Sequence, residues 1–173
     1  MSAEREAIIR VENFTAAYNG QVVLEDVNFE VFTGEIFFIL GSSGSGKSTL
    51  LKHMIGLYQP AAGRIIIEGH DIAAAQGEER REILRTFGVM YQSGALFGSM
   101  TLLENISLPL EEFTDLPPDA IRLIALMKLK QVGLENYGDL MPSELSGGMQ
   151  KRGAIARAMA LDPRVLFLDE LSA

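Results

Sequence analysis

Two runs of apolar residues stand out along the chain because no polar position interrupts them. They cover residues 36–40 and 165–168. A short, unbroken apolar run is the pattern of a parallel strand that is buried on both faces. Residues 87–91 are also apolar and β-prone, and Gln92-Ser93-Gly94 breaks the run. The pattern therefore predicts three buried strands.

Other segments predict strands with one wet face. Residues 27–31 alternate between apolar and polar side chains, which favours an antiparallel ribbon. Residues 8–14 are expected to form its partner strand, and Tyr18-Asn19-Gly20 between the two is a turn signal. A further short strand is predicted over residues 64–68.

Helical patterns dominate the second half of the chain, from about residue 101 to residue 160. Helix starts are predicted at Leu116-Pro117-Pro118-Asp119, since proline is tolerated in the first turn, and at Ser146-Gly147-Gly148. Two earlier helices are expected, one over residues 50–55 and one over the charged residues 78–85.

Composition narrows the class of protein. The chain has 173 residues, 47% of them hydrophobic, which is enough for one globular domain with a substantial core. The net charge of -8 argues against a nucleic-acid binder, which usually carries a basic field. The absence of cysteine excludes disulfides and thiolate sites. No secretory signal or membrane-spanning run is present, so a cytosolic protein is expected unless a partner holds it at a membrane.

The clearest chemical pattern follows the first apolar run, and it fits the phosphate-binding P-loop G-x-x-x-x-G-K-[ST]. The glycines let the backbone wrap a polyphosphate, and the backbone N–H groups and the start of the next helix then face the phosphates. Lys47 supplies a positive charge for the β- and γ-phosphates of ATP, and the Ser48 hydroxyl can ligate Mg²⁺. The loop consists of Gly41, Ser42, Ser43, Gly44, Ser45, Gly46, Lys47, Ser48 and Thr49.

An acidic pair, Asp169-Glu170, follows the apolar run at residues 165–168 and has the form of a Walker B element. At the carboxyl end of a strand, Asp169 can hold Mg²⁺ beside Ser48. Glu170 is then placed to polarise an attacking water as a general base. The alternative is a solvated acidic loop, which the upstream P-loop makes less favoured.

A second motif, Leu145-Ser146-Gly147-Gly148-Met149-Gln150, resembles the LSGGQ signature of ATP-binding-cassette (ABC) ATPases, with Met149 before Gln150. The resemblance covers essentially the whole chain. It implies an α/β P-loop NTPase fold with a RecA-like core sheet, an antiparallel β-subdomain and an inserted helical subdomain. It assigns residues 1–92 and 161–173 to the core and β-subdomain, and about 93–160 to the helical, signature-bearing subdomain.

The resemblance also implies roles for individual residues. Tyr18 is similar to the aromatic residue that stacks on adenine, and Gln92 to the Q-loop glutamine that reaches Mg²⁺ or the attacking water. The signature residues cap the γ-phosphate on a partner's P-loop, so that a dimer sandwiches two ATP molecules; they are Leu145, Ser146, Gly147, Gly148 and Gln150. His53 and His70 match no family position and are interpreted as ordinary helix and turn residues.

A finer resemblance lies in the segment from Gln92 to Leu110, which looks like the ATPases of Mce/Mla-type, or toluene-tolerance, lipid transporters. It implies an ATP-hydrolysing subunit that drives transport of phospholipids or other hydrophobic molecules. The implied partners are a second ATPase subunit, a transmembrane permease and an Mce-domain substrate-binding protein. The implied location is the cytoplasmic face of the inner membrane, through the permease.

Family members usually continue past Walker B, to a D-loop aspartate, a switch histidine and a strand that inserts beside the P-loop strand. This chain stops at Leu171-Ser172-Ala173. A gap in the sheet would leave buried backbone groups unpaired, at roughly 1–3 kcal/mol each. We therefore expect a fragment of a longer protein that folds and turns over ATP poorly alone. A cooperative melt with normal turnover would contradict this.

Two alternatives stay open. The first is a soluble ABC ATPase of DNA repair or translation, which the short helical insert and the acidic charge disfavour. The second is a nucleotide-binding module that binds ATP without turnover.

Overall fold

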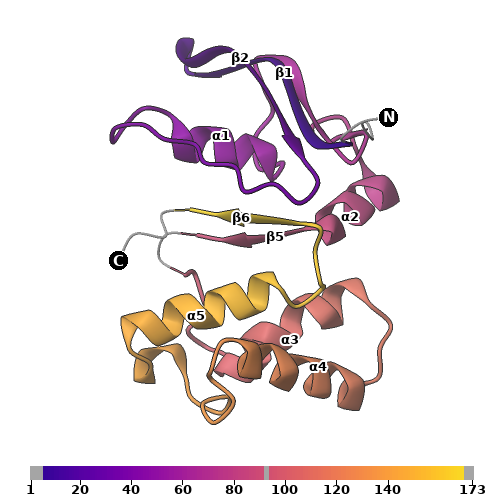
Figure 1. Ribbon diagram of the computed structural model, residues 1–173, viewed down its shortest axis with the longest axis vertical. Coiled ribbons are helices and arrows are strands. Elements are labelled where there is room, and N and C mark those ends of the chain that lie inside the picture. Colours follow the sequence, from indigo (N-terminus) through magenta and orange to yellow (C-terminus); the bar gives the residue numbers. More distant parts are fainter. Residues whose placement is uncertain (1–5, 92–93, 170–173) are drawn as a thin grey trace. The chain divides into compact units, whose positions relative to one another are not determined.

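The computed structural model describes residues 6–91 and 94–169 of the chain. The chain forms two compact units, Met1–Ile83 and Leu84–Ala173, which are described separately (Figure 1). No helix within the described residues is both long and apolar enough to cross a membrane. The division into core and helical subdomains that the sequence suggested stays a prediction.

The first unit is built on a four-stranded antiparallel sheet with the strand order β2-β1-β3-β4. A tight turn joins β1 to β2, and its two central residues, Asn19 and Gly20, both have positive φ angles (50° and 79°), as a type I′ hairpin requires. The elements are β1 (Ala7–Tyr18), β2 (Gln21–Phe32), α1 (Lys47–Met54), β3 (Ala62–Ile67), β4 (His70–Asp71) and α2 (Gly77–Thr86), which runs into the second unit.

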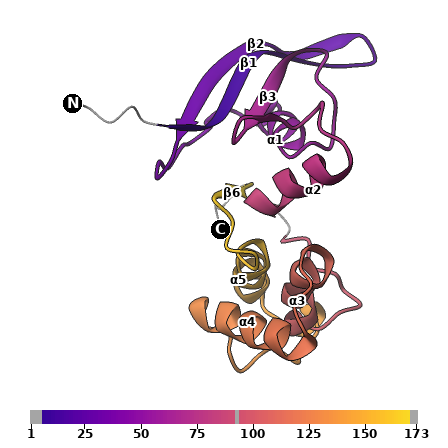
Figure 2. The same cartoon turned by 90° about the vertical axis from the view of Figure 1, so that its right-hand side faces the viewer.

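Helix α1 lies against one face of this sheet (Figure 2). Phe14 of β1 is fully buried, and its ring meets the ring of His53 of α1 edge-on, with the centroids 5.1 Å apart. Ile65 and Ile67 of β3 are also fully buried. The sheet buries the apolar side of its alternating strands and leaves the polar side exposed to solvent, which is the arrangement predicted from the sequence.

The strand predicted over residues 36–40 is wrong for the structure described here, because no strand is formed there and no described strand pairs with this segment. Its five apolar side chains are 41% to 88% exposed. An apolar run becomes a strand only when a neighbour satisfies its backbone N–H and C=O groups. The apolar side chains of residues 36–40 indicated burial, but the pattern could not show whether another strand pairs with their backbone.

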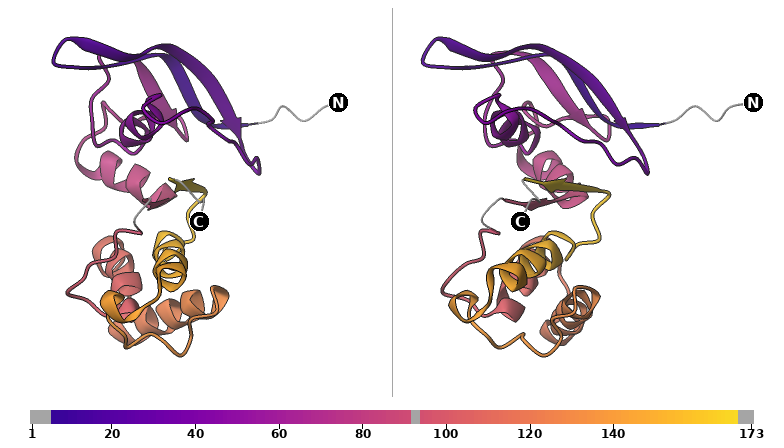
Figure 3. Two further views of the ribbon diagram at one scale, coloured as in Figure 1. Left: turned by 90° about the vertical axis from the view of Figure 1, so that its left-hand side faces the viewer. Right: turned by 60° about the vertical axis from the view of Figure 1, so that its left-hand side comes forward.

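The second unit pairs two short parallel strands with a group of helices (Figure 3). Leu102, Ile106 and Leu129 are fully buried in the core between these helices. Gly88 in β5 lets α5 approach closely, because a Cβ atom there would lie only 1.9 Å from the carbonyl oxygen of Ala158. The elements are β5 (Phe87–Met90), α3 (Leu102–Phe113), α4 (Pro118–Gln131), the 3₁₀ turn η1 (Pro142–Glu144), α5 (Gly147–Ala158) and β6 (Val165–Leu168).

Most helix boundaries lie close to those predicted, but the hairpin strands are longer. Strand β1 continues to Tyr18, beyond the predicted end at residue 14, and β2 begins at Gln21, before the predicted start at residue 27. Strands β5 and β6 pair in parallel, with Phe87 opposite Val165 and Met90 opposite Leu168, so both apolar runs form strands as expected. Burial on both faces is wrong for β6, because Leu166 and Leu168 are each 40% exposed. Helix α5 ends at Ala158, two positions before residue 160, where the helical pattern of the sequence ends.

Candidate nucleotide-binding site

The P-loop forms a compact turn in front of α1. Gly44 and Gly46 have positive φ angles of 79° and 92°, a conformation that glycine adopts without strain. The N–H of Ser45 donates to the carbonyl oxygen of Ser42 at 3.2 Å, which closes the turn. At Gly46 a Cβ atom would also meet the Leu24 side chain at 2.8 Å. Glycine at this position is therefore required both by the backbone angle and by β2.

Lys47 is the first residue of α1, and its side chain folds back over the loop. The ammonium Nζ donates to the carbonyl oxygens of Gly41 and Ser42, both at 2.8 Å. A polyphosphate oxygen is a stronger acceptor for an ammonium than a carbonyl is. The loop therefore holds Lys47 where an anion in the turn can take over its hydrogen bonds.

The start of α1 supplies further donors. The first intrahelical bond runs from the N–H of Leu50 to the carbonyl oxygen of Gly46, at 2.9 Å. The backbone N–H groups of the three preceding residues thus lack an intrahelical partner, and no side chain caps this helix. Such an uncapped N-terminus with a nearby lysine is suited to bind phosphate.

Tyr18 lies at the end of β1 and is 37% exposed. Its ring contacts the rings of His53 and Tyr58, with centroid distances of 6.2 and 5.7 Å. An aromatic ring that is packed on one side and open on another is suited to stack on a nucleotide base.

In the second unit, Asp169 follows β6 directly. Its N–H donates to the carbonyl oxygen of Met90 at 2.9 Å, which extends the pairing of β6 with β5 by one residue. Asp169 therefore lies at the carboxyl end of a strand, the position predicted for it, and its role as a Mg²⁺ ligand stays a prediction. Glu170 and Gln92, the predicted general base and Q-loop glutamine, lie outside the described residues.

A Mg²⁺ ion fits the chemistry of the predicted ligands. The Ser48 hydroxyl is exposed at the start of α1, and Asp169 offers a half-buried carboxylate; both are hard oxygen donors of the kind Mg²⁺ prefers. Within the described residues no group of three or more His, Cys, Asp or Glu side chains could hold a metal by itself.

The signature segment forms a helix N-terminus in the second unit. Ser146 caps α5, and its Oγ accepts a hydrogen bond from the N–H of Met149 at 3.3 Å. Gly147 and Gly148 are exposed, and a Cβ atom on either would meet nothing within 4 Å. The backbone of Gly147 and Gly148 at the start of α5 is therefore open to the surroundings, whereas the N–H of Met149 is capped. The signature role of this segment stays a prediction.

Gln150 points back into its own unit. Its Nε2 donates to the carbonyl oxygens of Pro142 and Leu145 at 2.8 and 3.2 Å. The side chain thus fixes the 3₁₀ turn η1 against the start of α5, and Leu145 is buried beside it. Gln150 therefore stabilises the backbone that precedes the signature helix, a role that the motif alone did not indicate.

Sequence reasoning missed Arg157, which links α5 to the segment that follows Gln92. Its guanidinium donates to the carbonyl oxygens of Ala95 and Gly94 at 2.8 and 3.2 Å and lies 5.7 Å from the centre of the Phe97 ring. Burial lowers the pKa of Arg157, although Tyr91 partly offsets this. Burial likewise raises the pKa of Tyr91, and the positive charge of Arg157 opposes that shift. No signal within one motif could have found a contact between such distant positions.

The rest of this segment is held by a buried amide. Asn105 is fully buried, and its Nδ2 donates to the carbonyl oxygens of Phe97 and Met100 at 3.1 Å and of Thr101 at 2.9 Å. Its Oδ1 accepts from the N–H of Phe97 at 2.7 Å. Asn105 therefore holds residues 97–101 against the first turn of α3.

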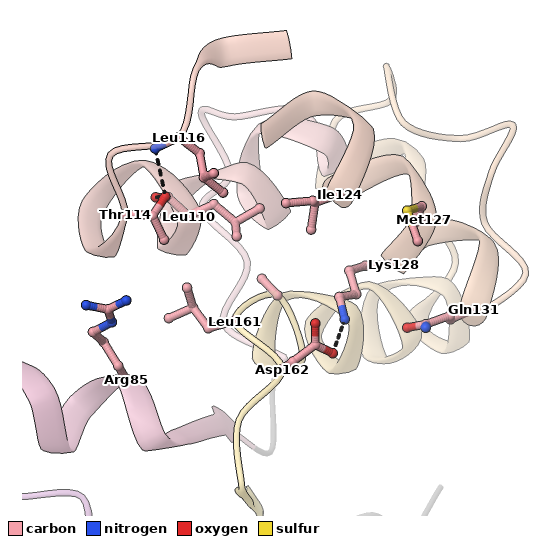
Figure 4. Close-up of a pocket in the computed structure, with 11 residues that line it drawn as sticks. Arg85, Leu110, Thr114, Leu116, Ile124, Met127, Lys128, Gln131, Leu161 and Asp162 are labelled. Carbon is pink, nitrogen blue, oxygen red and sulfur yellow. Dashed lines mark hydrogen bonds and ion pairs between the residues drawn. The ribbon is translucent and has the colours of Figure 1, made fainter. Parts of the chain in front are cut away.

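A mainly apolar pocket of about 300 Å³ lies between the C-terminal parts of α3 and α4 and the loop that follows α5 (Figure 4). Lys128, only 5% exposed, pairs with Asp162 on one side of it, and the Arg85 side chain reaches toward it from α2. It is lined by Arg85, Leu110, Thr114, Leu116, Ile124, Met127, Lys128, Gln131, Ala160, Leu161 and Asp162.

Comparison with known proteins shows the family to which the chain belongs. A sequence model of the ABC transporter family matches residues 24–173, so the chain belongs to that family. The intermembrane phospholipid transport system ATP-binding protein MlaF of Haemophilus influenzae is 44% identical over 94% of this chain. The probable ribonucleotide transport ATP-binding protein mkl of Mycobacterium leprae is also 44% identical over 94% of this chain. The chain spans 62% of the length of the first and 47% of the second.

Solved structures place the fold in the same family. The ATP-binding cassette MJ0796, in a dimeric post-hydrolysis state bound to ADP and phosphate, superimposes with a TM-score of 0.86 at 34% identity. The match covers 94% of this chain and 73% of the cassette. The CbiO1 protein of Clostridium perfringens, part of a CbiONQ transporter complex, gives a TM-score of 0.82 at 32% identity, covering 95% and 66% of the two chains. The predicted class, an ABC ATPase with a P-loop NTPase fold, is confirmed.

Proposed function

We propose that the protein is the ATP-binding and ATP-hydrolysing part of an ABC transporter subunit. The observation that carries this is the position of the Lys47 ammonium, held by the carbonyl oxygens of Gly41 and Ser42 in front of the uncapped start of α1. Triphosphate binding would exchange these carbonyls for β- and γ-phosphate oxygens. The Tyr18 ring would stack on adenine.

The hydrolytic step needs positioning and charge neutralisation more than covalent chemistry. Ser48, Asp169 and Gln92 would hold Mg²⁺, which neutralises charge on the phosphates when it is bound. Glu170 would accept a proton from the attacking water. The water oxygen would then attack the γ-phosphorus as the bond to the β-phosphate oxygen breaks.

The signature would act across a dimer. In the proposed assembly the bare N–H groups at the start of α5, with Ser146, Gly147 and Gly148, cap the γ-phosphate on the P-loop of a second subunit. The dimeric cassette MJ0796 supports this arrangement, since it is a family member that dimerises. Binding of two ATP molecules would close the dimer, and hydrolysis would reopen it.

The proposed machine includes a permease on the cytoplasmic face of the inner membrane and an Mce-domain substrate-binding protein. We propose that the segment between β5 and α3, together with the apolar pocket, contacts the cytoplasmic loops of the permease. Apolar lining side chains and the Arg85 cation suit an apolar loop that carries a carboxylate. A contact there would transmit closure of the dimer to the membrane.

The names of the relatives suggest two classes of cargo, phospholipid and ribonucleotide. We propose a phospholipid or a similarly hydrophobic molecule, because the segment from Gln92 to Leu110 resembles the lipid-transport ATPases.

The proposal is tested by ATP turnover of the protein with its permease in vesicles, with the Glu170→Gln variant beside the wild type. We expect the wild type to release phosphate, and the variant to bind ATP and dimerise without turnover. Transfer of labelled phospholipid, but not uptake of labelled ribonucleotide, would support the cargo. Equal turnover by both proteins would overturn the role of Glu170.

A further inference from the structure

Three aromatic rings gather where the hairpin of the first unit meets α1. They belong to Tyr18, His53 and Tyr58, and their centroids lie 5.7 to 6.2 Å from one another. The buried ring of Phe14 packs against the His53 ring, with the two centroids 5.1 Å apart. The sequence alone gave His53 the role of an ordinary helix residue, whereas the structure places it at the centre of this cluster.

His53 is buried, with only 2% of its surface exposed, while Tyr18 and Tyr58 are 37% and 44% exposed. The histidine therefore lies underneath and the two tyrosines lie at the surface. The Tyr18 and Tyr58 rings meet edge to face, with an interplanar angle of 84°. Edge-to-face contact favours one ring orientation over others, so the two rings fix each other.

His53 is also tied to the phosphate-binding end of α1. Its Nδ1 lies 2.8 Å from the carbonyl oxygen of Thr49. Since a carbonyl only accepts, Nδ1 carries the proton and donates. Thr49 is the last residue of the P-loop and follows Ser48 directly. One side chain thus connects the P-loop to the ring of Tyr18.

We propose that His53 is a positioning residue that holds the Tyr18 ring as the platform for the nucleotide base, with Tyr58 as a lateral support. This inference rests on the proposed function, in which Tyr18 stacks on adenine. The hydrogen bond to Thr49 fixes the imidazole, the imidazole supports the Tyr18 ring from below, and Tyr58 limits its rotation. The distance between the base platform and the phosphate loop is thereby set within one rigid group.

If His53 positions the Tyr18 ring, its replacement should weaken binding of a ligand that carries adenine but not of one that consists of phosphate alone. Calorimetric titration of the full chain with Mg-ATP, and separately with inorganic tripolyphosphate and Mg²⁺, gives the ratio of the two affinities. We expect His53→Leu to lower this ratio by about three- to tenfold, the loss of one or two aromatic contacts, with tripolyphosphate affinity unchanged. His53→Phe, which keeps a ring but loses the bond to Thr49, should fall between this variant and the wild type.

Because His53 is buried, its replacement can also destabilise the fold, so a second variant at an exposed position is needed. Tyr58→Leu changes an exposed residue and should lower the same ratio in the same direction, with an unchanged melting temperature. The matched control is His70→Leu, since His70 is an exposed histidine of the same unit that contacts Glu79, and its ratio should equal that of the wild type.

The possible outcomes distinguish failure of the proposed role of His53 from failure of the proposed ATP binding. If Tyr18→Ala lowers the ratio but neither His53→Leu nor Tyr58→Leu does, the inference is overturned while the base platform stands. If His53→Leu and Tyr58→Leu weaken ATP and tripolyphosphate binding equally, their effect is general and the inference is again overturned. If the wild-type chain does not bind ATP at all, the proposed function fails.

Discussion

The guanidinium of Arg157 donates a hydrogen bond to the carbonyl oxygen of Ala95 at 2.8 Å, across 62 positions of sequence. The contact joins the signature helix α5 to the segment that begins after Gln92. In the proposed mechanism these are the part that meets the partner's ATP and the part that meets the permease. A single side chain therefore connects two functional segments within one unit.

Replacing Arg157 should uncouple these segments. We expect Arg157→Met to lower the free energy of unfolding by about 1–3 kcal/mol, because two backbone carbonyls lose a charged donor. Denaturant titration measures the change. Arg122→Met, at an exposed position on α4, serves as the control and should stay close to the wild type. An equal loss in both variants would show that the Arg157 contacts contribute nothing particular.

Ser146 has two roles that substitution can separate. Ser146→Ala removes the cap of α5 and should cost about 1 kcal/mol of stability. Ser146→Asp restores a capping oxygen but sets a negative charge where the partner's γ-phosphate would lie. We expect the aspartate variant to melt like the wild type and yet to lose ATP-dependent dimerisation, measured by analytical ultracentrifugation. Dimerisation by this variant would contradict the proposed role of the signature.

The start of α3 should be sensitive to acid. Glu104 accepts hydrogen bonds from the N–H and the Oγ of Thr101 at 2.7 and 2.9 Å, and these hold its pKa below the ordinary value of 4.5. A lowered folded-state pKa adds stability above the unfolded-state pKa, and this is lost as the pH falls through the folded-state pKa. Denaturation midpoints from pH 7 down to pH 3 should fall less steeply for Glu104→Gln. The control, Glu111→Gln on the same helix, should follow the wild type.

The apolar pocket of the second unit should matter for transport and not for nucleotide binding. Leu116 lines it and is 39% exposed, so Leu116→Asp should fold. We expect this variant to bind ATP normally but to lose most permease-stimulated turnover in vesicles. Leu123→Asp, at a 61% exposed position of α4 outside the pocket lining, is the matched control. Normal stimulation of the Leu116 variant would remove the pocket from the proposed contact.

The motifs could be predicted because each is a local conformation with its own residue requirements. Gly44 and Gly46 adopt positive φ angles, and Ser146 caps a helix, whatever surrounds them. Spacing along the chain is enough to recognise such features. The apolar pattern also predicted that residues 87–91 and 165–168 form strands, although it did not indicate that the two pair with each other.

Features that depend on distant partners could not be predicted in this way. The apolar pattern of residues 36–40 indicated a buried strand, but pairing depends on another segment, and none of the described strands pairs with it. His53 and Arg157 look unremarkable in sequence, because their contacts with Tyr18 and Ala95 come from residues far along the chain. For Tyr18, the family resemblance suggested a base-stacking role, and the structure shows that the rings of His53 and Tyr58 contact its ring.

The most direct test of the account is ATP binding to the full chain, measured by calorimetry for the wild type and for Lys47→Ala. The ammonium of Lys47 is exchanged from loop carbonyls to phosphate oxygens in the proposed mechanism, so its loss removes charged hydrogen bonds from the bound state. We expect the wild type to bind Mg-ATP and the variant to bind about ten- to a hundredfold more weakly. Lys130→Ala, at an exposed position of α4, should leave binding unchanged. A wild-type chain without affinity for ATP, or equal affinity in the Lys47 variant, would contradict the central claim.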